Sequence, residues 1–277
     1  RCRGGGRAVP ERAGRPSATP ERGGADRGRR EGGGRGFLGC GRGGEGGSFL
    51  HGWRGGVVFS HPAGAPANAG LIATALARSA REAQWQPALE QMIDDVLGCT
   101  LDGESLRLAD LSAAQRIVEM GFELPLAPLA ASELNRLLLQ HEPLAARGAA
   151  LGFATIRGML SGFIDLVFEY RGRYFVADFK SNHLGASVED YAPPMLEASI
   201  AEHRYDLQYV LYSVALQRFL RARLGAAYDP DLHLGGVYYL YLRGMRRAAG
   251  AAYGVFHTRP AQALIDALDA LFAGRST

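Results

Sequence analysis

Cysteine, long apolar runs and lysine are all scarce in this chain of 277 residues. The three cysteines, Cys2, Cys40 and Cys99, match no metal-binding spacing and form no even disulfide framework, which suits a reducing compartment. No apolar stretch approaches the ~20 residues that a membrane-spanning helix needs, and the N-terminus lacks the hydrophobic core of a secretion signal. We therefore expect a soluble, cytoplasmic protein.

Lysine occurs once, at Lys180, whereas arginine occurs 30 times. The bias itself is typical of a GC-rich coding sequence. A single lysine in such a chain indicates a position that needs a compact ammonium, because an ammonium shifts its pKa and gives up a proton more readily than a guanidinium does. Survival of one lysine by chance is the alternative.

The charge is unevenly distributed along the chain. Residues 1–56 hold 20 Gly and 12 Arg against five acidic residues, a formal charge of +7, so the remainder carries about −4. Any basic surface on the folded part must then come from local clustering. We expect residues 1–70 to be a disordered segment, either a linker or the product of a misread gene start, with a nucleic-acid tether as the less favoured reading. Residues 71–277 form the predicted domain.

Hydrophobic periodicity predicts an α/β fold in which helices flank a small mixed β-sheet. There is no internal repeat. The expected elements are helical spacing over 71–98 interrupted at Pro87, a helix over 111–126 running into a short strand near 122–124, a helix over 131–140, a hairpin over 159–180, a long helix over 195–225 closed by Gly225, a strand over 234–244, and a helix over 259–274.

The segment GFIDLVFEYRGRYFVADFKSN, residues 162–182, is the most informative part of the chain. Apolar runs on both sides of Arg171-Gly172 predict a hairpin with a two-residue turn. Cross-strand partners in such a hairpin have residue numbers that add to 343, which places Asp165 opposite Asp178. Lys180 lies two residues further on, on the same face as Asp178.

Two carboxylates on facing strands repel each other, so a cation is expected between them. Lys180 supplies one positive charge. Two converging carboxylates in a setting of low dielectric constant are also typical of a divalent metal site with oxygen ligands. The alternative is a buried ion-pair cluster that only pins the hairpin.

The order Asp165, then Asp178-Phe179-Lys180, matches the motif of PD-(D/E)XK nucleases, and a glutamine-bearing helix follows it. The chain from about Glu119 to Gly274 resembles the C-terminal nuclease domain of the RecB family, the beta subunit of exodeoxyribonuclease V. The segments that carry the resemblance are RGMLSGFIDLVFEYRGRYFVADFKSNHLG, HRYDLQYVLYSVALQRFLR, GGVYYLYLRGM and TRPAQALIDALDALFAG. It implies a restriction-endonuclease-like core that cuts DNA with Mg²⁺, within a helicase–nuclease that processes double-strand breaks together with RecC-like and RecD-like subunits.

The resemblance also implies roles for the motif residues. Asp165 and Asp178 would bind Mg²⁺, with the backbone carbonyl of Phe179 as a further ligand. The metal would polarise the phosphate and lower the pKa of a bound water. Lys180 would orient that water or stabilise charge in the transition state.

Further ligands are implied upstream of the motif. Glu119 occupies the family's acidic position, and Glu123 is the alternative because the local register is open. His51, in GSFLHGW, resembles the family's N-terminal metal-binding histidine, although the sequence that follows it is glycine-rich instead of helical. His51 is thus either a ligand or a remnant without function.

Gln208 and Tyr212 match the family's helix motif after the lysine strand. Gln208 would hydrogen-bond the attacking water or a phosphate, and Tyr205 and Tyr212 would line the DNA path, with packing as the alternative and as the preferred reading for Tyr209. Four arginines are candidates for phosphate or subunit contacts, although solvation is the commoner case. They are Arg204, Arg218, Arg221 and Arg223.

A nucleotide-binding Walker A motif needs a lysine that this chain does not have, since Lys180 lies in DFKSN. We therefore expect the family's ATPase motor to be absent here and the chain to be a nuclease-domain fragment. The alternative function is a non-catalytic DNA-binding or subunit-docking module that keeps the nuclease fold. An RNA-binding role for the Gly/Arg segment rests on composition alone.

Overall fold

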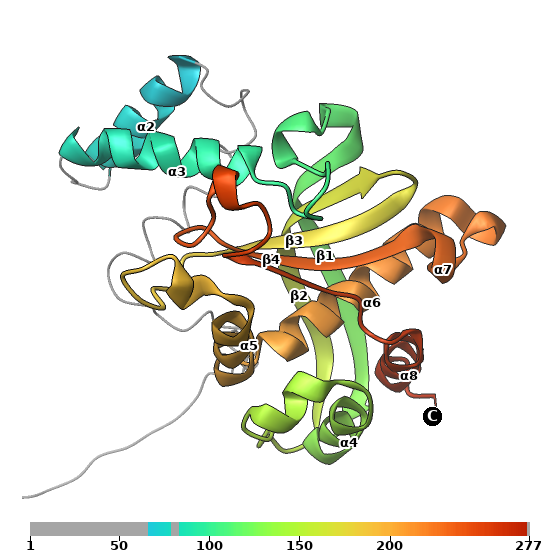
Figure 1. Cartoon of the computed structure of the whole chain (residues 1–277). Helices are drawn as coiled ribbons and strands as arrows, with labels where there is room; N and C mark the ends of the chain where they lie inside the picture. Colours follow the sequence, from blue (N-terminus) through green and yellow to red (C-terminus); the bar gives the residue numbers. More distant parts are fainter. Residues whose placement is uncertain (1–65, 79–82, 276–277) are drawn as a thin grey trace, which may run out of the picture. The chain divides into compact units, whose positions relative to one another are not determined.

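A five-stranded mixed sheet lies at the centre of the computed structural model, which describes residues 66–78 and 83–275 (Figure 1). Its strand order is β1-β2-β3-β4-β5, with β3 and β4 parallel and the other neighbours antiparallel. The strands are β1 (Arg116–Leu129), β2 (Ile156–Tyr170), β3 (Arg173–Lys180), β4 (Leu234–Tyr241) and β5 (Val255–Thr258). The predicted α/β fold with a mixed sheet is confirmed.

Helices cover both faces of this sheet (Figure 1). The helices are α2 (Pro66–Arg78), α3 (Gln86–Gly98), α4 (Ala131–His141), α5 (Pro193–Glu202), α6 (Tyr205–Leu224), α7 (Pro230–His233) and α8 (Gln262–Phe272). The first core lies between the sheet and α4, α5, α6 and α8, and the second lies between the sheet and α2 and α3. The long helix α6 contacts β1, β3 and β4, which brings its side chains over the middle of the sheet.

The β2–β3 hairpin has the predicted register. Its pairs run from Tyr170↔Arg173 to Leu166↔Ala177, and each adds to 343. Arg171 and Gly172 form the turn with φ of 53° and 79°, the left-handed pair that a two-residue hairpin turn requires. Main-chain pairing ends at Leu166, one position before the two aspartates would meet.

On both β1 and β2, the inward side chains switch from one core to the other at a single position. Val118 packs on the second core but Met120 belongs to the first, and Leu166 belongs to the second core but Ile164 to the first. Residues two apart on a regular strand share a face, so each strand has an irregular residue between them. Glu119, with φ of 53°, is that residue on β1.

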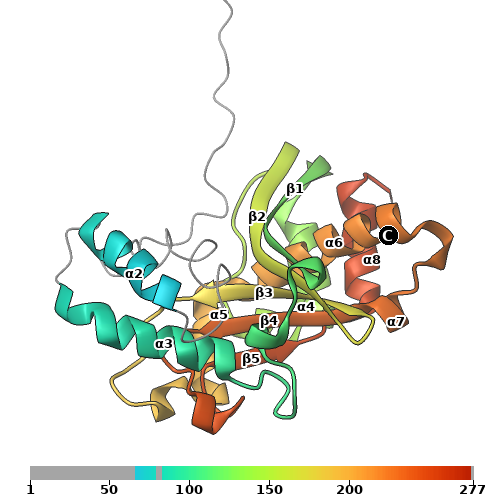
Figure 2. The ribbon, with the colours of Figure 1, turned by 90° about the horizontal axis from the view of Figure 1, so that it is seen from above.

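Asp165 occupies the matching position on β2. It lies opposite Glu119, because the flanking pairs are Val118↔Leu166 and Met120↔Ile164. Beyond this point β2 pairs with β1 alone. The two strands form a ribbon that curves away from β3 and β4 (Figure 2), so the sheet opens between β2 and β3 beside Asp165.

The prediction for 111–126 was right for the strand near 122–124, which belongs to β1, and wrong for the helix before it. The chain there forms short 3-10 turns at Leu108–Asp110 and Ala113–Gln115 and then the 14-residue strand β1. Burial alternates along β1 from Met120 to Leu124, as in a strand. The alternation extends back to Arg116, because every second residue from there to Leu124 is the more buried one, so the period of two was present in the sequence.

The single helix predicted over 195–225 is two helices. α5 ends at Glu202 and α6 begins at Tyr205, because Arg204 between them has φ of 54°. The Arg204 guanidinium donates two hydrogen bonds of 2.9 Å to the buried Asp206 carboxylate, which fixes the break. Gly225 closes α6 as predicted.

The remaining elements are close to expectation. Helix α4 and strand β4 lie where the pattern placed them, β5 was not predicted, and the terminal helix is shorter than 259–274. The proposed segment 1–70 lies almost entirely outside the described residues, and its boundary with the domain stays a prediction. None of the helices in the described part is long and apolar enough to cross a membrane, and cytoplasmic location stays a prediction.

Candidate functional site

The opening between β2 and β3 is bridged by a side chain instead of by the main chain. Asp165, partly buried, accepts a hydrogen bond from the backbone N–H of Phe179 at 3.0 Å through its Oδ2 atom. This bond replaces the strand pairing that ends at Leu166 and Ala177. Asp165 is thus attached to β3 next to Asp178, but the two aspartates do not form the cross-strand pair that the hairpin register predicted.

Asp178 and Lys180 form an ion pair inside the protein. Lys180 Nζ lies 2.9 Å from Asp178 Oδ2, and both side chains are almost fully buried. Despite this short distance the Oδ2 atom, which has no solvent exposure, accepts no aligned hydrogen bond. A buried carboxylate oxygen without a donor is incompletely compensated.

The Lys180 ammonium has three further neighbours on the α6 side of the sheet. It donates a 2.6 Å hydrogen bond to Gln208 Oε1 and lies 3.6 Å from the centre of the Tyr205 ring and 4.4 Å from that of Tyr239. Aromatic faces attract cations, and most strongly away from water. The one lysine of the chain is therefore held by a carboxylate, an amide oxygen and two rings.

Gln208 connects Lys180 to β2 through two further hydrogen bonds. Its Nε2 donates to the Tyr212 hydroxyl at 2.9 Å, and that hydroxyl donates to the backbone carbonyl of Phe163 at 3.2 Å. The predicted face of Tyr205, Gln208 and Tyr212 on one side of the helix is thus the face that meets the lysine. In this arrangement Gln208 positions Lys180.

Tyr239 belongs to the site but was missed by sequence reasoning. It pairs with Asp178 across the parallel β3–β4 ladder. Its hydroxyl lies 2.8 Å from the Tyr205 carbonyl and 3.0 Å from Gln208 Oε1. Burial, and then the nearby Asp178 charge, raise the pKa of Tyr239 well above its usual value, so the hydroxyl keeps its proton and remains a donor.

The residues predicted to complete a metal sphere are less close together. Glu119 faces Asp165 across the ribbon but is exposed, and Glu123 is exposed opposite Ser161. His51 lies outside the described residues. Within residues 66–78 and 83–275, no three side chains of His, Cys, Asp or Glu gather into a metal site.

A two-carboxylate site still fits Mg²⁺. This ion commonly takes one or two protein carboxylates and keeps several of its waters, so it does not require a cage of side chains. Asp165 and Asp178 supply that number of carboxylates at the opening of the sheet, and the Asp178 carboxylate already accepts a cation, the Lys180 ammonium. The donor set is oxygen-rich, as a hard cation prefers.

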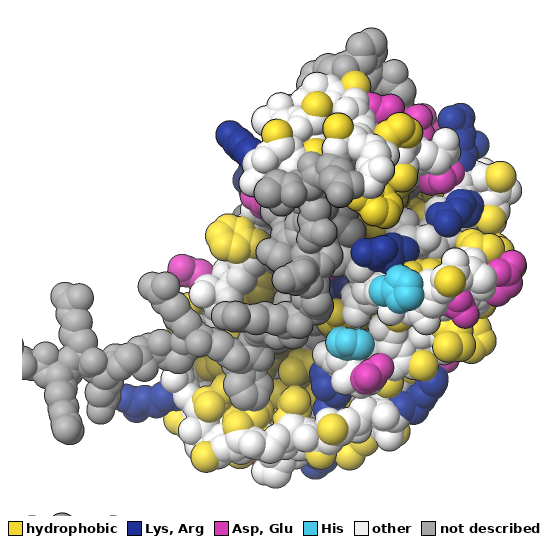
Figure 3. Space-filling view, turned by 90° about the vertical axis from the view of Figure 1, so that its left-hand side faces the viewer, with side chains coloured by type: hydrophobic (Ala, Val, Ile, Leu, Met, Phe, Trp, Pro, Cys, Tyr) yellow, Lys and Arg dark blue, Asp and Glu magenta, His cyan; other side chains and the backbone are white. Residues whose placement is uncertain are grey.

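The candidate arginines mostly serve the fold. Arg204 binds Asp206, while Arg218 and Arg221 on α6 bind Asp269 on α8. Arg223 lies over the Phe219 ring of its own helix at 5.2 Å. The face drawn in Figure 3 mixes both signs of charge with hydrophobic side chains and has no broad basic area.

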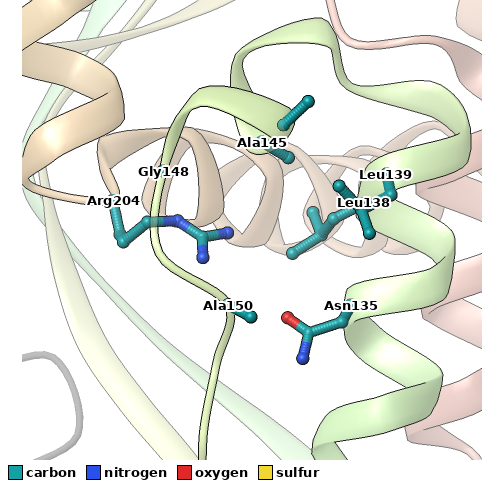
Figure 4. Close-up of a pocket in the computed structure, with 8 residues that line it drawn as sticks. Asn135, Leu138, Leu139, Ala145, Gly148, Ala150 and Arg204 are labelled. Carbon is teal, nitrogen blue, oxygen red and sulfur yellow. The ribbon is translucent and has the colours of Figure 1, made fainter.

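A cavity of about 60 Å³ lies apart from this site. Its lining comes from α4, from the chain that follows it and from Arg204, and is otherwise made of small or apolar side chains except for Asn135 (Figure 4). The space is much smaller than the several hundred Å³ that ligand pockets usually have. The opening of the sheet therefore remains the candidate site.

Known proteins resemble this chain over most of its length. No family model matches it. It is 42% identical over 234 residues to the protein named RecBCD enzyme subunit RecB in Escherichia coli, a match that covers 84% of this chain and 19% of that protein. Proteins of the same name in Mycobacterium tuberculosis and Haemophilus influenzae are 39% and 36% identical over 68% and 67% of the chain.

The chain contains a RecB-like region. It spans less than a fifth of the length of these curated relatives. A continuous match to 84% of 277 residues begins no later than about residue 46, so the RecB-like region includes the segment around His51. It also includes the whole opening of the sheet with Asp165, Asp178 and Lys180.

Proposed function

We propose that this chain is a Mg²⁺-dependent deoxyribonuclease that hydrolyses phosphodiester bonds at the opening between β2 and β3. One observation carries the proposal: Asp178 and Lys180 form a buried ion pair where the sheet opens, next to Asp165. Burying two charges in a protein core costs free energy, so a buried ion pair at an opening of a sheet indicates a functional site.

The metal would be held by the Asp165 and Asp178 carboxylates and by the Phe179 carbonyl, with Glu119 and His51 as further proposed ligands. When bound, Mg²⁺ supplies Lewis acidity toward the phosphate and a water of lowered pKa. Lys180 places a positive charge beside the same carboxylate, where it stabilises negative charge that develops on the phosphate oxygens.

The neighbours of Lys180 fix that charge in position. Gln208 Oε1 accepts from the ammonium, and Gln208 in turn donates to Tyr212. Tyr205 and Tyr239 exclude water on the side of their rings. Charged groups that are oriented before the reaction need no reorganisation during it, which is the main source of electrostatic catalysis.

The resemblance to RecB also supports a proposal about the biological role and the partner subunits. We propose that the chain corresponds to the nuclease part of a RecBCD-type exodeoxyribonuclease, works with RecC-like and RecD-like subunits, and acts in double-strand-break repair and recombination. The support is the identity of 31–42% to a group of RecB proteins over more than half of this chain.

The test is degradation of end-labelled linear single-stranded DNA by the purified chain, with Mg²⁺ or EDTA and without ATP. We expect cleavage only with Mg²⁺. Asp165→Asn should reduce the rate at least 100-fold, because the amide still accepts the Phe179 N–H bond but carries no charge for a metal.

Asp231→Asn is the matched control, since Asp231 is an exposed carboxylate on α7, which precedes β4 at the end of the sheet away from Lys180. It should cut at the wild-type rate. DNA that is bound but never cut, under every metal condition, would refute the nuclease and favour a non-catalytic DNA-binding module.

A further inference from the structure

The opening of the sheet has two edges. On β2, the hairpin register continued beyond its last pair would place Phe163 opposite Lys180, but main-chain pairing has ended by then. On the other side, the chain leaves β3 at Ser181 and runs beside the end of β4, where Leu242 N–H donates to the Lys180 carbonyl at 3.0 Å. A molecule that reaches Lys180 passes between these edges.

Phe163 is the most exposed large hydrophobic side chain in the described part of the protein, with 69% of its surface open. One edge of its ring lies 3.4 Å from where a Cβ on Gly121 would stand, so the ring rests over a strand position that has no side chain. Its carbonyl is held by Tyr212. A flat apolar surface is thus fixed two residues before Asp165 and open to solvent.

Arg243 lies at the other edge. Its Nε donates to the Ser181 carbonyl at 3.1 Å, directly after Lys180, and its side chain is partly buried. No carboxylate of a described residue lies within ion-pair distance of it, in contrast to Arg204, Arg218 and Arg221. A guanidinium held in place without a neighbouring carboxylate is suited to bind a phosphate.

We propose that an unpaired DNA strand crosses this opening with one base stacked on Phe163 and one phosphate bound by Arg243. The inference rests on the proposed nuclease function and assigns two residues that hold the strand beside Lys180. Bases inside a duplex are already stacked on their neighbours, whereas an unpaired base gains from an aromatic surface whatever its identity. The arginine and the Lys180 charge favour a polyanion over an apolar peptide.

The test is binding of a short fluorescent oligonucleotide of mixed sequence in EDTA, measured by anisotropy at several salt concentrations. Phe163→Ala should weaken single-strand binding about 10-fold, since stacking on one aromatic side chain contributes ~1–3 kcal/mol. Its salt dependence should not change. Met159→Ala is the matched control, because Met159 is 57% exposed on the same strand but further from Lys180, and it should bind as the wild type does.

Arg243→Gln should change the salt dependence instead. Loss of one phosphate contact lowers the slope of log affinity against log salt by about 0.7 for a single strand. Arg136→Gln, which removes an exposed charge on α4, should leave the slope unchanged. Binding of a blunt duplex should be insensitive to Phe163→Ala.

Several outcomes would overturn the proposal. The first is a wild-type chain that does not bind the single strand. The second is an equal effect of Phe163→Ala and Met159→Ala on single-strand affinity, or an equal loss of duplex and single-strand affinity in Phe163→Ala. The third is an unchanged salt slope in Arg243→Gln. An inert Phe163→Ala would assign the exposed ring to a protein contact. Because the assay contains no metal, a chain that binds as predicted but never cuts DNA refutes the nuclease and not the strand path.

Discussion

At the scale of single residues, the site combines a buried ion pair with a side chain that replaces main-chain pairing. Asp165, Asp178, Lys180 and Gln208 could be predicted, because they lie close together in sequence or at helical spacing along one face. Tyr239 could not. It reaches the site through a parallel strand pair whose register depends on the crossover through α5, α6 and α7, and no local spacing encodes that register.

The buried ion pair predicts strong coupling between its members. Lys180→Met leaves the Asp178 carboxylate buried without a cation and should lower the free energy of unfolding by about 3–5 kcal/mol. The double variant Lys180→Met/Asp178→Asn removes both charges and should be more stable than Lys180→Met alone. Urea denaturation of the single and double variants measures this. Additive losses would show that the two charges do not stabilise each other.

Glu142 gives a prediction about pH. It is almost fully buried at the start of the turn Pro143–Arg147 and accepts from Leu144 N–H. Burial, followed by the charge of Asp206, raises the pKa of this carboxyl above 4.5. The folded state then binds more protons than the unfolded state above pH 4.5, so stability falls as pH rises through the folded pKa.

Glu142→Gln removes this titration and keeps an acceptor for Leu144. Its melting temperature should exceed that of the wild type by a few degrees at pH 7 and equal it near pH 4, as measured by circular dichroism. A variant that melts lower than the wild type at pH 7 would mean that the ionised carboxylate stabilises the fold.

At the scale of elements, the hairpin was the most predictable part and β1 the least. The β2–β3 turn and register follow from two local signals, an apolar alternation and an X-Gly pair. β1 keeps a period of two in burial through Glu119 although its side chains change core there, and the break before α6 depends on the Arg204–Asp206 ion pair. Backbone conformations with positive φ at residues other than glycine are set by tertiary contacts, which local propensity does not report.

The hairpin turn predicts opposite effects at its two positions. Arg171 takes a left-handed conformation that asparagine tolerates better, so Arg171→Asn should raise the free energy of unfolding by about 0.5–1 kcal/mol. The arginine gives up only exposed contacts with Ser105 and Tyr170.

Gly172→Ala should lower stability by about 1 kcal/mol through backbone strain alone, because nothing lies within 4 Å of the added Cβ. Chemical denaturation of both variants provides the comparison. Stabilisation by alanine, or destabilisation by asparagine, would contradict the turn geometry.

At the scale of the whole molecule, the fold opens the sheet between β2 and β3 beside Asp165 and Lys180. Beyond Glu119 and Asp165 the β1–β2 ribbon belongs to the first core alone, while β3, β4 and the end of β2 are covered on both faces. The opening between the two parts holds every predicted catalytic side chain within the described residues. The account therefore depends on one claim, that a divalent metal binds at this opening.

The measurement that tests this claim most directly is the melting temperature of the chain and of Asp165→Asn across a Mg²⁺ titration. At ten times the Kd a bound ligand stabilises the folded state by about 1.4 kcal/mol, which corresponds to several degrees in a small domain and less in a larger one. We predict this rise for the wild type and for Asp231→Asn, and its loss in Asp165→Asn. An equal rise in Asp165→Asn would place the metal elsewhere and contradict the account.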